Sequence, residues 1–256
     1  MDVRNWAYGG LEGPPQWTGR CQSGKRQSPV DLAPEDPGEV LGEAPVAHAF
    51  ARGGATVRDG GRGTLVVDLD AGSYSVAAAS GQAFDLRGVE FHVASEHTVG
   101  GTSHPVEAQL RHRASDGTVL HVSVLFQVGE SPNPFLQQAL ENASLRAGGD
   151  DGLSRKLLAP PSFPTADAGV RVAGMDPSDL IPASPAVATY EGSLTAPPCT
   201  EGVRWAVYLS PLSVTAEQVV LLQEWVGRSA GVIDGTAMNY RPVQPLEGRT
   251  VGVYAP

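Results

Sequence analysis

Short apolar runs separated by glycine-containing turns dominate the pattern of the chain. Segments 87–93 and 106–113 alternate between polar and apolar positions, which is typical of strands with one buried face. Segments 64–69 and 119–128 are rich in β-branched residues and leucine, and they are also predicted to be strands. Asp116 and Gly117 stand between two of these segments and predict a hairpin turn. The pattern indicates a mostly β fold.

Two helices are predicted from their start signals. Asn133 and Pro134 precede an apolar-periodic segment at 135–142, where Asn suits the N-cap and Pro the first helical position. Thr215 to Gln218 forms a capping box before segment 219–225. Segment 148–185 is rich in Pro, Ala and Gly, and we expect an irregular surface meander there. No repeat or shift in composition divides the chain, so residues 1–256 are predicted to form a single domain.

Composition supports many turns and excludes several partners. The 256 residues include 31 glycines and 21 prolines, and the formal net charge is −10. An acidic chain is not expected to bind nucleic acid or an anionic membrane surface non-specifically. No apolar stretch is long enough to span a bilayer. The first residues contain no apolar signal segment, so we expect a cytosolic protein or a mature secreted domain.

Cys21 and Cys199 are the only two cysteines of the chain. Two cysteines are too few for a zinc ribbon or for a disulfide-rich miniprotein. From composition alone they are either two buried thiols or one long-range disulfide.

Several motifs occur in an order that resembles the α-class carbonic anhydrase family. They span nearly the whole chain, so the set is far more specific than any single motif. The motifs are Trp6-Ala7-Tyr8-Gly9, Gly13-Pro14, Gln27-Ser28-Pro29-Val30-Asp31, Phe91-His92-Val93-Ala94-Ser95-Glu96-His97-Thr98, the run from Tyr190 to Cys199, and the run from Asn239 to Leu246.

The resemblance implies a fold and a compartment. The family fold is a large twisted, mainly antiparallel sheet with a few short peripheral helices and a conical cavity on one face. Cys21 and Cys199 match the positions that are bridged in secreted members of the family. The resemblance therefore implies a disulfide and a secreted or periplasmic location. Free thiols at these positions would instead indicate the cytoplasm.

The zinc site that the resemblance implies is altered in this chain. Family members hold zinc with three histidines, two spaced as His-x-His on one strand and one on the adjacent strand. Here the three positions hold Glu90, His92 and Gln109. The amide oxygen of glutamine is a weak neutral ligand, and oxygen-rich sets suit Mg or Mn better than Zn. We therefore expect no zinc and no other cofactor.

Further changes affect the expected cavity. Alternation from Gln109 places Arg111 on its floor, and His121 stands where the family has an apolar residue. Glu96 and Thr195 match the family pair that orients the attacking hydroxide, and both are retained. The remaining residues predicted to line the pocket are Gln109, Leu194, Ala196, Trp205 and Tyr8.

Other polar residues are expected to have no part in the chemistry. His97 and Glu107 are predicted to be structural. His48, His104 and His112 belong to no motif, and they are expected at the surface or at sheet edges.

The residues leave three functional hypotheses open. The first is a metal-independent acid–base enzyme of lyase, cyclase or hydratase type, with Glu90 as general base, His92 or His121 as proton donor, and Arg111 as the clamp for a small anionic molecule. The second is a catalytically silent ligand-binding protein, in which an ion pair between Glu90 and Arg111 fills the space of the metal. The third is a hydratase with an altered metal site made of Glu90, His92 and His121. The sequence does not predict the oligomeric state.

Overall fold

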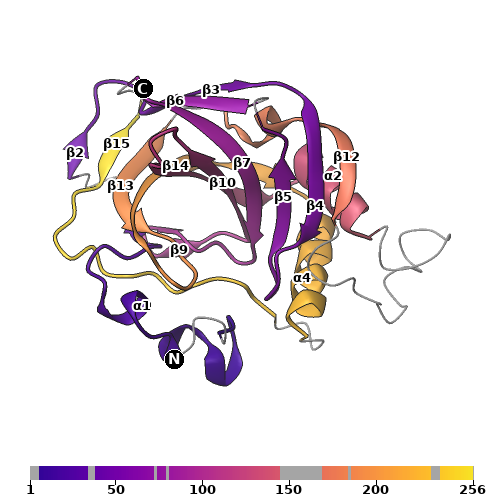
Figure 1. The fold of residues 1–256 in the computed structure, drawn as a ribbon, viewed down its shortest axis with the longest axis horizontal. Helices are drawn as coiled ribbons and strands as arrows, with labels where there is room; N and C mark the ends of the chain where they lie inside the picture. Colours follow the sequence, from indigo (N-terminus) through magenta and orange to yellow (C-terminus); the bar gives the residue numbers. More distant parts are fainter. Residues whose placement is uncertain are drawn as a thin grey trace.

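A computed structural model describes residues 6–33, 38–71, 74–78, 81–144, 169–183, 186–231 and 237–255. Its main feature is a twelve-stranded sheet whose path runs β12-β4-β5-β7-β10-β11-β14-β13-β15-β2, with β3 and β6 joined to the edge of β7. Figure 1 shows these strands curving round a common centre. The strands are β2 (Glu39–Val40), β3 (Val46–Phe50), β4 (Gly53–Asp59), β5 (Leu65–Leu69), β6 (Tyr74–Ala78), β7 (Ala83–His92), β10 (Val106–Arg113), β11 (Val119–Val128), β12 (Val170–Met175), β13 (Val187–Ser193), β14 (Glu201–Val214) and β15 (Gly252–Tyr254).

The sheet is mainly antiparallel, as predicted. Its parallel pairs are β11 with β14 and β15 with β2. A separate three-stranded sheet contains β1 (Asp31–Leu32), β8 (Thr98–Val99) and β9 (Thr102–Ser103). The predicted strands 106–113 and 119–128 agree with β10 and β11, whereas β7 begins four residues before the predicted segment 87–93.

Two helices pack at the periphery of the sheet, where they were predicted. Helix α2 (Pro134–Ser144) begins after Asn133, whose Oδ1 accepts a hydrogen bond from the backbone of Leu136. Helix α4 (Ala216–Ala230) begins with the capping box of Thr215 and Gln218 and ends at Gly231 in the left-handed region. It extends beyond both ends of the predicted segment. The remaining helices of the described residues are single turns: η1 (Gly10–Glu12), η2 (Pro14–Gln16), α1 (Arg20–Ser23) and η3 (Pro177–Leu180).

The predicted meander at 148–185 was wrong where the structure describes it. Strand β12 pairs antiparallel with β4, and η3 follows it directly. Val172 and Met175 are buried, so this apolar edge of the segment packs against the core instead of staying irregular. The other residues of the segment, 148–168 and 184–185, lie outside the described residues.

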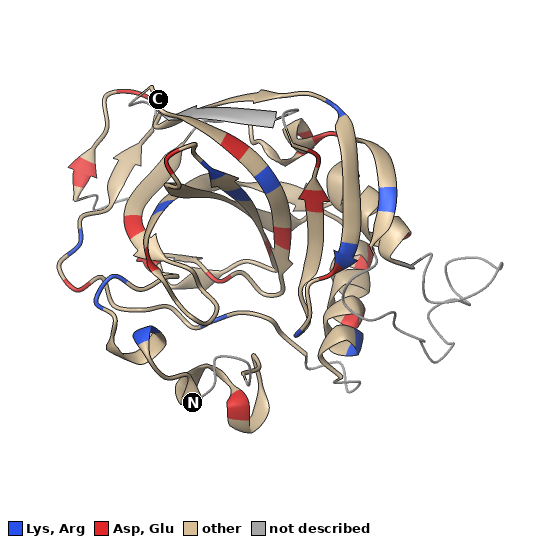
Figure 2. Cartoon of the chain, viewed as in Figure 1, with Lys and Arg blue, Asp and Glu red and all other residues tan. Residues whose placement is uncertain are grey.

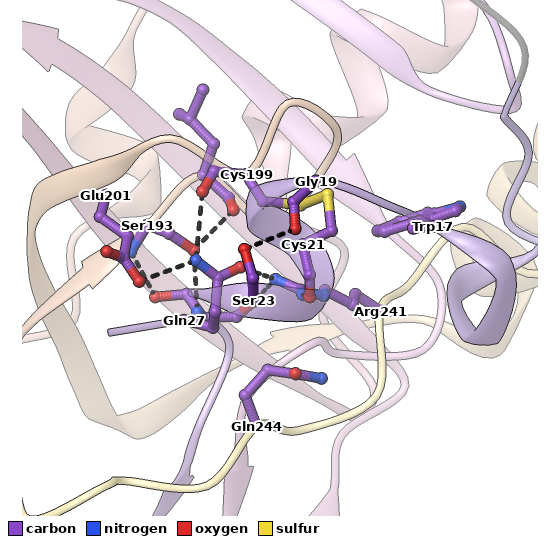
Figure 3. The surroundings of a disulfide bond; sticks show 12 residues. Trp17, Gly19, Cys21, Ser23, Gln27, Ser193, Cys199, Glu201, Arg241 and Gln244 are labelled. Carbon is purple, nitrogen blue, oxygen red and sulfur yellow. Dashed lines mark hydrogen bonds between the residues drawn. A yellow bond between two sulfur atoms is a disulfide. The ribbon is translucent and has the colours of Figure 1, made fainter. Parts of the chain in front are cut away.

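A disulfide joins the N-terminal region to the sheet. Cys21 in α1 is bonded to Cys199, with their Cα atoms 5.0 Å apart. Figure 3 shows the bond beside Gln27 and Arg241. The guanidinium of Arg241 donates to the backbone oxygens of Cys21 and Ser28 at 2.6 and 2.7 Å. The disulfide implied by the resemblance is therefore present.

In the described part of the chain, no helix is long and apolar enough to cross a membrane.

Candidate functional site

The sheet register brings the predicted site residues to one face. Gln109 lies opposite Glu90 on β7, and Arg111 lies opposite His121 on β11. His121 lies in turn opposite Trp205 on β14. Directly paired residues point to the same face of a sheet, and residues two apart on one strand do so as well. This arrangement agrees with the shared face that alternation predicts.

Four charged side chains on this face form a chain of ion pairs, which we call the ion ladder: Glu90, Arg111, Asp68 and Arg58. Nη1 of Arg111 lies 3.1 Å from Oε1 of Glu90, and Nη2 lies 3.0 Å from Oδ1 of Asp68. The other carboxylate oxygen of Asp68 binds Nε of Arg58. The strands that carry these charges are neighbours in Figure 2. The side chains are between 27% and 38% exposed, so the ladder is partly solvated.

Gly88 leaves the space through which Arg111 reaches Asp68. It lies between them in the register, opposite Asp68 on β5 and Arg111 on β10. A Cβ atom built on Gly88 would stand 2.6 Å from Nη2 of Arg111 and 2.7 Å from the backbone oxygen of Val67. Any larger residue would therefore push the guanidinium away from Asp68.

His92 is held at the buried end of the same face. Its Nδ1 lies 2.6 Å from the backbone oxygen of Asn239, so this nitrogen carries the hydrogen and Nε2 is the second titrating atom. Nε2 is buried without a hydrogen-bond partner and lies 3.7 Å from Oε2 of Glu96. Burial opposes a charge on the ring, but the carboxylates of Glu96 and Glu107 outweigh this effect and raise the pKa of His92.

Glu107 is the centre of a fully buried group of hydrogen bonds, which we call the buried network. Its carboxylate accepts hydrogen bonds from the backbone of Glu96 and His97, from Nδ1 of His97, and from the side chains of Gln109 and Ser123. His97 continues the network through Nε2 to the hydroxyl of Tyr190 at 2.7 Å. Burial alone would raise the pKa of Glu107, but the charge and hydrogen bonds of His97 hold it at about 2.

Gln109 belongs to this buried network. Its Nε2 donates to Oε2 of Glu96 at 2.7 Å and to Oε1 of Glu107 at 3.0 Å. The other oxygen of Glu96 accepts a hydrogen bond from the backbone of Arg241. Within the described part of the chain, Thr195 makes no hydrogen bond to Glu96. The pair that the resemblance implied is therefore present as residues but not joined in this structure.

His121 lies against an aromatic wall. Its ring is 4.8 Å from the ring of Trp205, which also lies 4.8 Å from the ring of His97. Nδ1 of His121 is buried without a hydrogen-bond partner. Burial and the nearby charge of Arg111 lower the pKa of His121 to about 3. The ring is therefore neutral at neutral pH and is a poor proton donor there.

The pattern of one protein family matches almost all of the chain. The eukaryotic-type carbonic anhydrase pattern covers residues 12–255. The chain belongs to this family. Its sheet, its disulfide and the motif residues of the site face are thereby placed in the carbonic anhydrase fold, which was the fold that the motifs implied.

Relatives within the carbonic anhydrase family include enzymes and dioscorins. A carbonic anhydrase from Nostoc is 30% identical, over 96% of this chain and 85% of that protein. Dioscorin DB3L from Dioscorea polystachya is 32% identical, over 94% of this chain and 79% of that protein.

Solved structures of the family superpose on nearly the full chain. The α-carbonic anhydrase from Thermovibrio ammonificans in complex with sulfanilamide has a TM-score of 0.77 at 30% identity, and covers 97% of this chain and 98% of its own. A dioscorin complexed with ascorbate has a TM-score of 0.78 at 28% identity, and covers 98% of both chains.

The predicted pocket residues lie in different surroundings. Trp205 and Thr195 are buried, whereas Leu194 and Ala196 are half-buried. Tyr8 lies beside His92, with ring centroids 6.4 Å apart, and it lines a pocket of about 700 Å³ next to the site. Burial and the charges of Glu96 and Glu90 raise the pKa of Tyr8 well above its usual value.

Sequence reasoning missed several residues that build the site. Asp68 and Arg58 are the outer half of the ion ladder, and the one signal was the charged residue Asp68 inside the predicted strand 64–69. Asn239 fixes His92 through its backbone oxygen, a contact that no motif shows. The expectation that His112 lies at the surface or an edge was wrong, because it is 1% exposed and its Nδ1 lies 2.9 Å from the backbone oxygen of Leu110.

Proposed function

We propose that this carbonic anhydrase-family protein binds a small molecule at the site face without zinc, and that it does not hydrate carbon dioxide. The observation that carries the proposal is the position of Arg111, which is fixed between Glu90 and Asp68 at 3.1 and 3.0 Å. A permanent cation thus pairs with the carboxylate that replaces the first imidazole of the family site.

The donor set supports the proposal because it does not fit zinc. Of the three positions, only His92 offers an imidazole nitrogen, and Glu90 is already neutralised by Arg111. Gln109 offers a weak amide oxygen, and its nitrogen is engaged by Glu96 and Glu107. No three histidine, cysteine, aspartate or glutamate side chains are grouped as a metal site among the residues that the structure describes. The alternative set of Glu90, His92 and His121 would place a metal ion beside the guanidinium of Arg111, which repels it.

The test combines metal content with carbon dioxide hydration in a series of variants. We expect the wild type to contain far less than one zinc per chain and to show no hydration above buffer. E90H/Q109H restores the three imidazoles and is expected to bind some zinc with little hydration. E90H/Q109H/R111V removes the nearby cation as well and should bind zinc more tightly. Stoichiometric zinc in the wild type, with hydration that a sulfonamide inhibits, would overturn the proposal.

A second candidate is the metal-independent acid–base enzyme, and the geometry of His92 favours it. The His92 ring is buried, one nitrogen is fixed by Asn239, and the other makes no hydrogen bond but lies near the carboxylate of Glu96. With its raised pKa, this ring is suited to proton transfer. The ion pair with Arg111 makes Glu90 a weaker candidate for the base than His92. If this candidate is correct, His92→Gln abolishes product formation but leaves ligand-induced thermal stabilisation in place. Stabilisation of the wild type without any product supports the binding protein instead.

The ligand is proposed to be a small molecule that contacts the site face and the pocket beside Tyr8. Structures of relatives in complex with sulfanilamide and with ascorbate support a small-molecule partner. The capacity of Arg111 to bind an anionic ligand is lower than predicted, because both of its terminal nitrogens already bind carboxylates.

The disulfide supports a secreted or periplasmic location.

A further inference from the structure

A second pocket lies on the opposite face of the sheet from the proposed site. Segment 39–46 runs from β2 to β3 (Figure 1). Together with residues of β13 and β14, it lines a pocket of about 540 Å³. Arg204 and Ala206 line this pocket. They alternate along β14 with Trp205, whose ring packs on the site face against His121, so they point away from the site. The volume is within the usual range for small-molecule pockets.

The inner end of this pocket is apolar. Its walls include Leu41, Val46, Phe84, Leu120 and Ala206. Phe84 is 0% and Leu120 is 4% exposed, so both belong to the main core and form a fixed floor. Apolar surface of this kind favours a ligand with an aromatic or branched aliphatic body.

The residues just beyond this inner end carry no charge at neutral pH. Tyr208 follows Ala206 on the same face of β14, and its hydroxyl lies 2.7 Å from Nε2 of His48. Burial lowers the pKa of His48 to about 4. Burial and the nearby charge of His48 lower the pKa of His112 to about 3. The inner end therefore offers no charged group to a ligand.

The mouth of the pocket is acidic. Exposed Glu39 and Glu43 lie on the covering segment, and neither has a basic partner among the residues that the structure describes. Glu191, also at the mouth, is neutralised by Arg26. Arg204 donates to the side chain of Gln82 at 2.9 Å. Two carboxylates against one arginine leave the mouth with an excess of negative charge.

We propose that this pocket is a second ligand site, distinct from the site face, and that it binds a small organic cation with an apolar body. The apolar end enters towards Phe84 and Leu120, and the ammonium group lies at the mouth between Glu39 and Glu43. A neutral molecule of the same shape loses this attraction. An anionic molecule is in addition repelled by the excess negative charge of the mouth.

The test uses the full oxidised chain with three probes of similar shape, followed by calorimetric titration. The probes are 2-phenylethylamine, 2-phenylethanol and 3-phenylpropanoate. We expect the amine to bind more tightly than the alcohol, and the carboxylate to bind least. Equal affinity for the amine and the alcohol would overturn the charge recognition, and no binding of the amine at millimolar concentration would overturn the site.

Two variants and one control locate the binding. E39Q/E43Q removes the charge at the mouth and is expected to weaken amine binding about threefold to fivefold per carboxylate. Thr189→Trp places a large ring in the pocket from β13 and should abolish binding of the amine. Glu217→Gln removes an equivalent exposed charge from α4 and should leave binding unchanged. Unchanged affinity for the amine in E39Q/E43Q, or binding that survives Thr189→Trp, would overturn the proposal. Weakened binding in the first variant and abolished binding in the second, with Glu217→Gln unchanged, would support it.

Discussion

The buried network and the ion ladder lie side by side on one face of the sheet but place their charges by opposite means. Glu107 of the buried network and Arg111 of the ion ladder are four residues apart on β10. Glu107 is 0% exposed and accepts hydrogen bonds from five donors. The ion ladder keeps its charges partly in water and pairs them with one another. A buried charge needs every partner in place, whereas a solvated one does not.

This difference indicates which parts of the site tolerate substitution. In the buried network, His97, Glu107 and Tyr190 depend on one another, so the loss of one leaves buried groups of the others unpaired. The ion ladder can lose a member, because water replaces the missing partner at little cost. Gln109 is itself part of the buried network, since it donates to both Glu96 and Glu107.

The largest expected effect follows from a change at the centre of the buried network. Glu107→Gln places an amide where two or more donors converge, and the unfolding free energy should fall by about 3–5 kcal/mol. Chemical denaturation of the oxidised protein measures this loss. Glu90→Gln in the ion ladder is the matched control and should lose less than about 1 kcal/mol. Equal losses in the two variants would remove the distinction between the two regions.

A second change tests the space through which the ion ladder crosses β7. Gly88→Ala brings a Cβ to 2.6 Å from Arg111 and 2.7 Å from the backbone oxygen of Val67. We expect a destabilisation of about 1–3 kcal/mol from this overpacking, measured by thermal and chemical unfolding. The double variant G88A/R111A should recover part of the loss, because one of the two contacts is relieved. A double variant as unstable as the sum of the single ones would show that Arg111 does not occupy that space.

The sequence predicted the strands and the shared site face from local patterning, and the motifs of the family implied the fold. Segment 106–113 alternates and segment 119–128 is an unbroken run of strand-forming residues, so the bounds of β10 and β11 were predicted correctly. The ion pair between Arg111 and Glu90 was predicted and is present. Asp68 could not be predicted as a second partner, because it lies 43 residues from Arg111 and meets it only through the register of β5, β7 and β10. The start of β7 was missed because its alternation is interrupted there. Arg111 pairs with Gly88 and His112 pairs with Leu86, so Arg87 is an extra residue between the two pairs.

A smaller effect concerns pH and a buried histidine on the opposite face. Burial and the charge of His48 lower the pKa of His112 to about 3 in the folded protein, against 6.5 for an ordinary histidine. Below pH 6.5 the unfolded chain binds a proton that the folded chain excludes, so stability is full above this pH and falls as the pH drops towards 3. His112→Asn should reduce the slope of stability in this window by up to about 1.4 kcal/mol per pH unit.

The smallest expected effect is the removal of the central cation of the ion ladder. Arg111→Met keeps the length of the side chain and leaves Glu90 and Asp68 without their shared partner, but both carboxylates are partly solvated. We therefore expect a loss of less than about 1 kcal/mol, which shrinks further at high salt because solvated charges are screened. Denaturation at low and high ionic strength measures both quantities. A loss of several kcal/mol that does not depend on salt would mean that the ion ladder behaves as a buried ion pair, and that Arg111 is fixed as firmly as Glu107.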